Sequence, residues 1–245
     1  MTTVATRPLD AARARDIARA FLPESRLGNR YHYFYTRAKL GSDPLYPGVA
    51  DALRGSTAPL LDLGCGLGLL AHTLRADGID LPYRGVDVDA CKIADATRVA
   101  ARAGLRDVVF ETVDLTRATP SHAGSVAILD VLQYVDPGAQ AAILDAAIAM
   151  LAPDGLLVIR TGLDDGGRRL RFTHFADRVG RLVGWMYSAP RRYPREDELR
   201  ARLAAAGLEV EFMPLYGNTP FNNWRIVARR PRGTVAPQAS GSTQR

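Results

Sequence analysis

Four residues between positions 62 and 68 have the types and spacing of a ligand-binding turn. Asp62 lies in an apolar run, and Gly64, Gly66 and Gly68 follow it at alternate positions. Glycine adopts backbone angles closed to other residues and lets a bound molecule approach the main chain closely. Free amides at the start of the helix expected after Gly68 would point at the same place. The pattern therefore predicts a strand, a tight turn and a helix that together bind a nucleotide-like molecule.

The glycine spacing differs from the dinucleotide-binding fingerprint. Gly-x-Gly-x-x-Gly requires a glycine where Leu69 stands, and it does not place an acid two residues before the first glycine. Asp62 is such an acid. An NAD-linked oxidoreductase therefore stays an alternative function that the spacing argues against.

Further acids follow the next predicted strands. Asp87 ends one strand, Asp114 follows another, and Asp130 lies near the end of a third. Carboxyl ends of parallel strands meet at one edge of a sheet, where ligands bind in open α/β folds. We therefore expect these acids to lie near Asp62.

Strand and helix patterns alternate along the chain, which predicts an α/β fold. Helices are expected at 9–21, 69–76, 90–103, 137–151 and 195–206, and strands at 59–63, 82–89, 108–113, 125–131, 156–161, 208–216 and 224–229. The last two strands have only a short link and should pair antiparallel. The predicted fold is a doubly wound, mostly parallel seven-stranded sheet with a terminal antiparallel pair.

Length and composition fit one large domain with appendages. The chain has 245 residues, of which 47% are hydrophobic, and a net charge of +6. We expect an N-terminal helical and aromatic cap at 1–50, a catalytic domain at 51–230 with an insertion at 162–194, and a disordered tail at 231–245. No stretch approaches the roughly 20 apolar residues of a membrane span, and the arginine-rich start is unlike a signal peptide, so a cytoplasmic protein is expected.

The run Leu61-Asp62-Leu63-Gly64-Cys65-Gly66-Leu67-Gly68, the later Asp87 and the strand order resemble the class I S-adenosylmethionine-dependent methyltransferases. The resemblance covers about residues 50–230 and implies S-adenosylmethionine (SAM) as cofactor. The cofactor-binding residues that it implies are Asp62, Gly64, Cys65, Gly66, Gly68, Asp87, Val88, Asp114, Leu115 and Asp130.

The same resemblance implies a role for most of these residues. The glycines would lie against the methionine part of the cofactor, and Asp62 would face its ammonium group. Asp87 would bind the ribose, with Val88 beside the adenine. Asp114 would accept a hydrogen bond from the adenine amino group and Leu115 would contact the ring, although Asp114 could instead cap the turn that follows it.

The acceptor side is read from the aromatic residues. Tyr31, Tyr33 and Tyr35 form the densest aromatic cluster, which packs the N-terminal helix, forms a wall for an aryl substrate, or does both. Tyr134 is a further candidate for substrate binding. The segment Asp43-Pro44-Leu45-Tyr46-Pro47 predicts a break in helical structure.

Residues 31–47 are also weakly similar to methyltransferases found alongside aryl-polyene pigment biosynthesis, an instance of secondary metabolism. That similarity implies an aromatic acyl acceptor, free or attached to an acyl carrier protein. Asn-Pro-Pro-Tyr and Asp-Pro-Pro-Tyr, signatures of some nucleic-acid and protein methyltransferases, are absent at 130–134. A small-molecule or carrier-bound substrate is therefore expected.

Methyl transfer needs a positioned nucleophile, and a general base is optional. His32 and His174 are the candidates for taking a proton from an acceptor hydroxyl. No pattern of metal ligands is present in the sequence, so no metal site is expected. The arginine-rich flanks leave a non-catalytic nucleic-acid-binding protein as a further, less favoured alternative.

Overall fold

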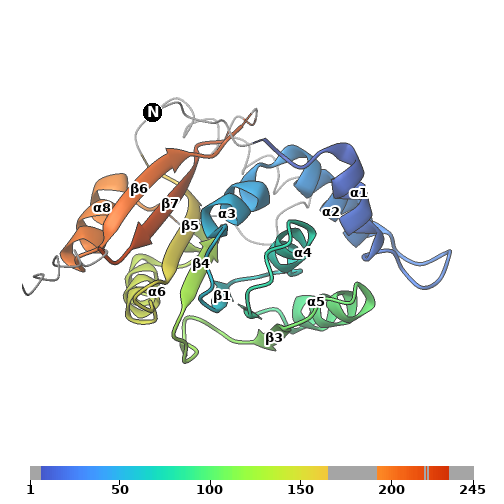
Figure 1. The fold of residues 1–245 in the computed structure, drawn as a ribbon, viewed down its shortest axis with the longest axis horizontal. Helices are drawn as coiled ribbons and strands as arrows, with labels where there is room; N and C mark the ends of the chain where they lie inside the picture. Colours follow the sequence, from blue (N-terminus) through green and yellow to red (C-terminus); the bar gives the residue numbers. More distant parts are fainter. Residues whose placement is uncertain (1–6, 165–191, 218, 220, 232–245) are drawn as a thin grey trace, which may run out of the picture.

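The computed structural model describes residues 7–164, 192–217, 219 and 221–231. Its centre is a seven-stranded sheet in the order β3-β2-β1-β4-β5-β7-β6 (Figure 1). The strands are β1 (Leu60–Leu63), β2 (Tyr83–Asp87), β3 (Val108–Thr112), β4 (Ser125–Leu129), β5 (Leu156–Gly162), β6 (Glu209–Pro214) and β7 (Asn223–Arg229). The first five are parallel, whereas β7 pairs antiparallel with both β5 and β6. The predicted fold class is confirmed.

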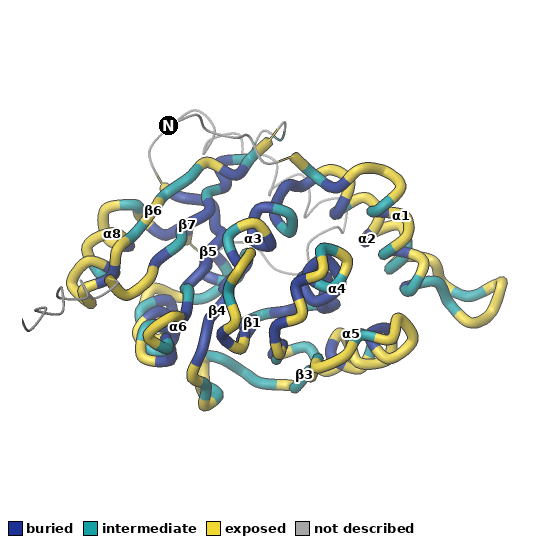
Figure 2. The backbone as a smooth tube through the Cα atoms, viewed as in Figure 1, coloured by how far each residue is buried: buried dark blue, intermediate teal, exposed yellow. Residues whose placement is uncertain are grey.

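Helices cover both faces of the sheet. They are α1 (Ala11–Arg19), α2 (Tyr31–Ser42), α3 (Leu45–Leu53), α4 (Leu69–Ala76), α5 (Ala90–Arg102), the 3-10 helix η1 (Leu132–Tyr134), α6 (Pro137–Ala149) and α8 (Glu196–Ala205). Alternate strand residues pack against α6 and α8 on one face and against α3 and α4 on the other. Figure 2 shows that the central strands are buried, as expected for strands covered on both faces.

The sheet face covered by α3 and α4 carries charged side chains of the candidate site. Leu61 and Leu63 of β1 pack toward α6, so Asp62 between them points to the α3 and α4 face. By the same alternation, Arg160 of β5 lies on that face, because Leu157 and Ile159 pack on the other. The sheet therefore presents buried charged side chains beneath α3, among them Asp62, Arg160 and, on β7, Arg225.

The break predicted at 43–47 was only half right. Helix α2 ends at Ser42, but α3 begins at Leu45 and contains Pro47. Proline is tolerated in the first turn of a helix, because the amide that it lacks has no intrahelical acceptor there. The Asp43 carboxylate accepts from the Leu45 amide at 3.0 Å and so starts the new helix.

Two predicted appendages fall largely outside the described residues. Most of the insertion at 162–194 and nearly all of the tail at 231–245 are among the residues that the structure leaves undescribed. Helix α3 crosses the predicted domain boundary at residue 50. Within the described part of the chain, every helix is too short or too polar to span a bilayer.

Candidate functional site

The glycine turn follows β1 and is held by the end of β2. The amides of Gly64 and Cys65 both donate to the Val86 carbonyl, at 2.7 and 2.9 Å. Gly64 has a φ of 81°, and a Cβ built there would lie 2.3 Å from Cγ2 of Val131. Gly66 also has a positive φ, but no atom lies within 4 Å of its virtual Cβ. The turn thus excludes side chains at Gly64 and leaves open space beside Gly66.

Asp62 lies behind this turn and is almost fully buried. The hydroxyl of Tyr83 donates to its Oδ2 at 2.6 Å, while its buried Oδ1 has no hydrogen-bond partner among the described residues. Burial raises the pKa of Asp62 to about 7; the Tyr83 hydrogen bond opposes the rise and the nearby Asp87 adds to it. A carboxylate in this state would be stabilised by a cation that reaches Oδ1.

Asp87 lies at the end of β2 and fixes the turn. Its Oδ2 accepts from the Gly66 amide and its Oδ1 from the Asp89 amide, both at 2.9 Å. Each carboxylate oxygen can accept two hydrogen bonds, so acceptor capacity remains for a ligand. Asp89 caps α5 by accepting from the amides of Cys91 and Lys92, in keeping with the choice of Asp87 as the predicted ribose partner.

The residues predicted to surround the adenine lie on the next strand ends. Val88 is exposed and Leu115 packs partly against the core. Asp114 accepts from both the amide and the hydroxyl of Thr116, at 2.9 and 2.6 Å, and these bonds lower its pKa. It therefore makes the turn-capping contacts that were the alternative to adenine binding, and the adenine role stays a prediction.

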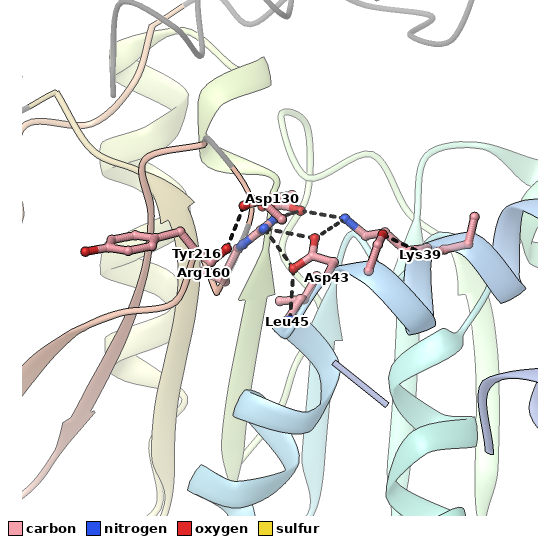
Figure 3. Close-up of polar contacts among 9 residues, drawn as sticks. Lys39, Asp43, Leu45, Asp130, Arg160 and Tyr216 are labelled. Carbon is pink, nitrogen blue, oxygen red and sulfur yellow. Dashed lines mark hydrogen bonds and ion pairs between the residues drawn. The ribbon is translucent and has the colours of Figure 1, made fainter. Parts of the chain in front are cut away.

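An ionic cluster lies at the ends of β4 and β5 and was missed by sequence reasoning (Figure 3). Arg160 is buried and forms ion pairs with Asp130, which follows β4, and with Asp43, at 3.0 Å, between α2 and α3. Lys39 of α2 donates to Asp43 at 2.7 Å and lies 3.7 Å from Asp130. Arg160 and Lys39 lower the pKa of Asp43 against the effect of burial.

Asp130 has an unusual backbone conformation at this position. Its φ is 59°, a left-handed conformation that costs a residue other than glycine free energy and persists only when the surroundings fix it. The pairing with Arg160 supplies such a constraint. The only sequence signals for the cluster were a charged residue in a buried strand pattern and an Asp-Pro pair before an apolar helix.

The aromatic cluster lies on α2, outside the sheet. Tyr31 and Tyr35 stack with ring centroids 6.0 Å apart, and Tyr33 contacts Phe34 edge-on. Tyr31, Phe34 and Tyr35 are exposed, so α2 presents aromatic surface rather than burying it all. Tyr134 lies in η1, directly after β4.

The two histidine candidates have different outcomes. His32 of α2 lies 3.3 Å from Asp95 of α5 and so ties the two helices together. His174 lies outside the described residues. Neither role as a proton acceptor is tested, and both stay predictions.

A buried acid, an open turn and a helix N-terminus lie together at the end of β1. Asp62 has an unpartnered oxygen, and the glycine turn and the N-terminus of α4 follow it at the carboxyl end of this strand, beside which the strand order reverses. These features fit the ammonium and the methionine chain of SAM, and the fold with its reversed β7 is that of the class I methyltransferases. Among the described residues no cluster of potential metal ligands is found.

Comparison with known proteins gives the family. The sequence model described as "Methyltransferase domain" matches residues 16–211, and the chain belongs to this family. The predicted methyltransferase and its SAM cofactor are thereby confirmed, and solved structures of similar fold include one with SAM bound.

Curated relatives share a more specific name. Ubiquinone biosynthesis O-methyltransferase of Xylella fastidiosa (strain M23) is 28% identical over 195 residues, covering 77% of this chain and 78% of the relative. The enzyme of that name from Psychrobacter cryohalolentis is 32% identical over 107 residues, covering 42% of this chain. That match spans only 40% of the Psychrobacter protein.

Solved structures agree on the fold. Mitomycin 7-O-methyltransferase has a TM-score of 0.61 at 25% identity, covering 82% of this chain and 57% of its own. Magnesium protoporphyrin IX methyltransferase from Synechocystis, with bound S-adenosylhomocysteine, has a TM-score of 0.61 at 17% identity, covering 88% and 94%.

Proposed function

We propose that this chain transfers a methyl group from SAM to a hydroxyl of a small aromatic acceptor, free or bound to a carrier. The observation that carries the cofactor part is the unpartnered buried Oδ1 of Asp62 beside the open Gly66 turn. The acceptor part rests on the exposed tyrosines of α2 and on two similar proteins named O-methyltransferases, the ubiquinone biosynthesis enzyme of Xylella fastidiosa and mitomycin 7-O-methyltransferase.

Five of the predicted cofactor residues have a defined role in this proposal. Asp62 binds the ammonium group, Asp87 the ribose hydroxyls and Asp114 the adenine amino group. Gly66 lets the methionine chain lie against the backbone. Cys65 is buried beside Asp62, and burial raises the pKa of its thiol, so it acts as a packing group and not as a nucleophile.

Chemistry in this site depends on position. When bound, SAM supplies an electrophilic methyl group on a sulfonium. The protein would hold the acceptor oxygen in line with the carbon–sulfur bond and keep water out, which supplies most of the acceleration in such a displacement. Tyr31, Tyr33, Tyr35 and Tyr134 form the acceptor wall in this proposal, and the hydroxyl proton leaves to water, His32 or His174.

The wider organisation is part of the same proposal. Residues 1–50 act as a cap over a catalytic domain at 51–230, and this domain carries the insertion at 162–194. An acyl carrier protein, which is acidic, would suit the basic flanks of the chain. We expect the protein to act in the cytoplasm.

The test is transfer of labelled methyl groups from SAM to a panel of acceptors. The panel contains phenols, aryl amines and aryl acids, each free and attached to a carrier protein. We expect label on a phenolic hydroxyl, lost in Asp62→Asn. The matched control is Asp80→Asn, at an exposed aspartate outside the site. Transfer only to nitrogen or carbon, or transfer that survives Asp62→Asn, would contradict the proposal.

A further inference from the structure

Tyr46 is a residue of the site that no sequence pattern singled out. It lies in the first turn of α3, and its ring packs against two clusters of buried side chains, one between α3, α4 and the sheet and one between α1, α2 and α4. A ring fixed on both sides has little rotamer freedom left to lose when a ligand binds.

The hydroxyl of Tyr46 lies within electrostatic reach of the acids of the site. Its pKa is raised well above 10, first by burial and then by the neighbouring Tyr35, Asp130, Asp43 and Asp62. The phenol is therefore protonated at neutral pH and acts as a hydrogen-bond donor. No hydrogen bond from this hydroxyl is found among the described residues, although the nearby hydroxyl of Tyr83 is paired with Asp62.

The first turn of α3 is held in place by buried charges. Asp43 caps the helix through the Leu45 amide and is fixed by Arg160 from β5 (Figure 3). One helical turn on, Arg225 of β7 donates to the Gly48 carbonyl at 2.6 Å. Tyr46 lies between these two attachments, so its position is set by the sheet and not by α3 alone.

The charge balance around the hydroxyl decides which ligand group it suits. Asp43 and Asp130 are neutralised by Arg160 and Lys39. Asp62 is left to pair with a cation. In SAM, the α-carbon of the methionine part bears both an ammonium group and a carboxylate. A carboxylate brought in beside Asp62 requires a donor there. The Tyr46 hydroxyl donates to no described residue; Arg160 Nε is also unpartnered, but its guanidinium is already paired with Asp43 and Asp130.

We propose that the Tyr46 hydroxyl donates a hydrogen bond to the carboxylate of the methionine part of the cofactor. Asp62 and Tyr46 then recognise the two charged groups of one amino acid from two sides, β1 below and α3 above. This rests on the proposed SAM site, and it makes α3 a part of that site and not only a cover for the sheet.

Calorimetric titration of Tyr46→Phe tests the inference without any measurement of activity. The ligands are S-adenosylhomocysteine and its decarboxylated analogue, which keeps the ammonium and the adenosine. We expect the Kd of S-adenosylhomocysteine to rise about tenfold, as for loss of a hydrogen bond to a charged group, and the Kd of the analogue to change less than about twofold. Tyr216→Phe is the matched control, because the Tyr216 ring points away from the ionic cluster in Figure 3.

The outcomes separate the inference from the function it rests on. If Tyr46→Phe binds S-adenosylhomocysteine as well as the unaltered protein, or loses both ligands equally, the inference is overturned and the SAM site stands. If the unaltered protein binds neither ligand, the proposed function and this inference fall together. The thermal unfolding midpoint without ligand is recorded for each variant and should change little in Tyr46→Phe.

Discussion

The glycine turn after β1 and the helix pair α2–α3 both border the candidate site, and they are held by different means. The turn is fixed by backbone: positive φ values at Gly64 and Gly66 and amides that donate to Val86 and Asp87. The helix pair is fixed by side chains: Lys39, Asp43 and Arg160 join residues more than a hundred positions apart in the sequence.

This difference separates what each side can tolerate. A backbone turn is damaged by any side chain that the conformation forbids, whatever its charge. A buried ion cluster is damaged by loss of one partner, because the others are then left buried and uncompensated. Substitutions in the turn should therefore act through the backbone conformation, and substitutions in the helix pair through the balance of buried charge. Four predictions test this contrast, from the largest expected effect to the smallest.

Arg160→Met should have the largest effect on stability. It leaves Asp43 and Asp130 with only Lys39, so the free energy of unfolding should fall by about 3–5 kcal/mol. Urea unfolding measures this change. Arg229→Met is the control, since the Arg229–Glu209 pair is about half exposed and should contribute under about 1 kcal/mol. Equal losses in the two variants would mean that the buried cluster does not hold the helix pair.

Gly64→Ala should follow, with an effect on both folding and cofactor affinity. The alanine would adopt a left-handed conformation, costing about 1–2 kcal/mol, and its Cβ would overlap Val131, adding roughly 1–3 kcal/mol. Gly78→Ala isolates the first cost, because Gly78 also has a positive φ but has open space at Cβ. Urea unfolding should give a much lower free energy of unfolding for Gly64→Ala than for Gly78→Ala, and titration should give it a lower affinity for S-adenosylhomocysteine. Similar values for the two variants would mean that the turn shifts easily.

The affinity for S-adenosylhomocysteine should depend on pH through Asp62. With a pKa of about 7, the carboxylate is mostly protonated at pH 6, so the Kd there should be roughly tenfold higher than at pH 8. In the ligand-free protein the free energy of unfolding should change in the opposite direction. The contribution of protonated Asp62 to stability is present near pH 4 and is lost as pH rises through 7.

Two variants test the assignment to Asp62. Asp62→Asn should bind weakly and without this pH dependence. Tyr83→Phe removes a hydrogen bond that lowers the pKa of Asp62, so the midpoint of the affinity profile should move to higher pH. A profile that is unchanged in Tyr83→Phe would assign the titration to another group.

Tyr35→Leu should have the smallest effect and only on the acceptor. Loss of one aromatic contact corresponds to about 0.5–1.5 kcal/mol, so the KM for an aromatic acceptor should rise roughly three- to tenfold. The Kd of S-adenosylhomocysteine should not change, because Tyr35 is an exposed residue of α2 that contacts the acceptor, and not the cofactor, in the proposed site. A change in that Kd without a change in KM would remove the distinction between the two sides.

The turn could be predicted because its information is local. Asp62, Gly64 and Gly66 stand within five residues of one another, and the strand and helix patterns on either side fix their direction. The ends of the later strands followed from the rule that parallel strands finish at one edge, which gave Asp87, Asp114 and Asp130 their places.

The helix pair could not be predicted in the same way. Pro44 and Pro47 suggest a loop, although Asp43 before an apolar run with Val49 and Leu53 is also the pattern of a capped helix start. Arg160 gave no sign of its partner, because Asp43 lies 117 residues away and only the sheet brings them together. The role proposed for Tyr46 could not be predicted either, because it depends on neighbouring residues that only the fold brings together.

The placement of Arg160 opposite Arg225 on neighbouring strands has a consequence for the order of assembly. Both cations face α3, and the hydrogen bond from Arg225 to the Gly48 carbonyl joins residues 177 positions apart. The N-terminal helices leave the ribosome first, and α3 can pack early against α4 and β1, yet its polar attachments belong to β5 and β7, which are made last or nearly so. We expect α3 to take its final position only after synthesis is almost complete, so that until then it stays accessible to chaperones in a nascent chain.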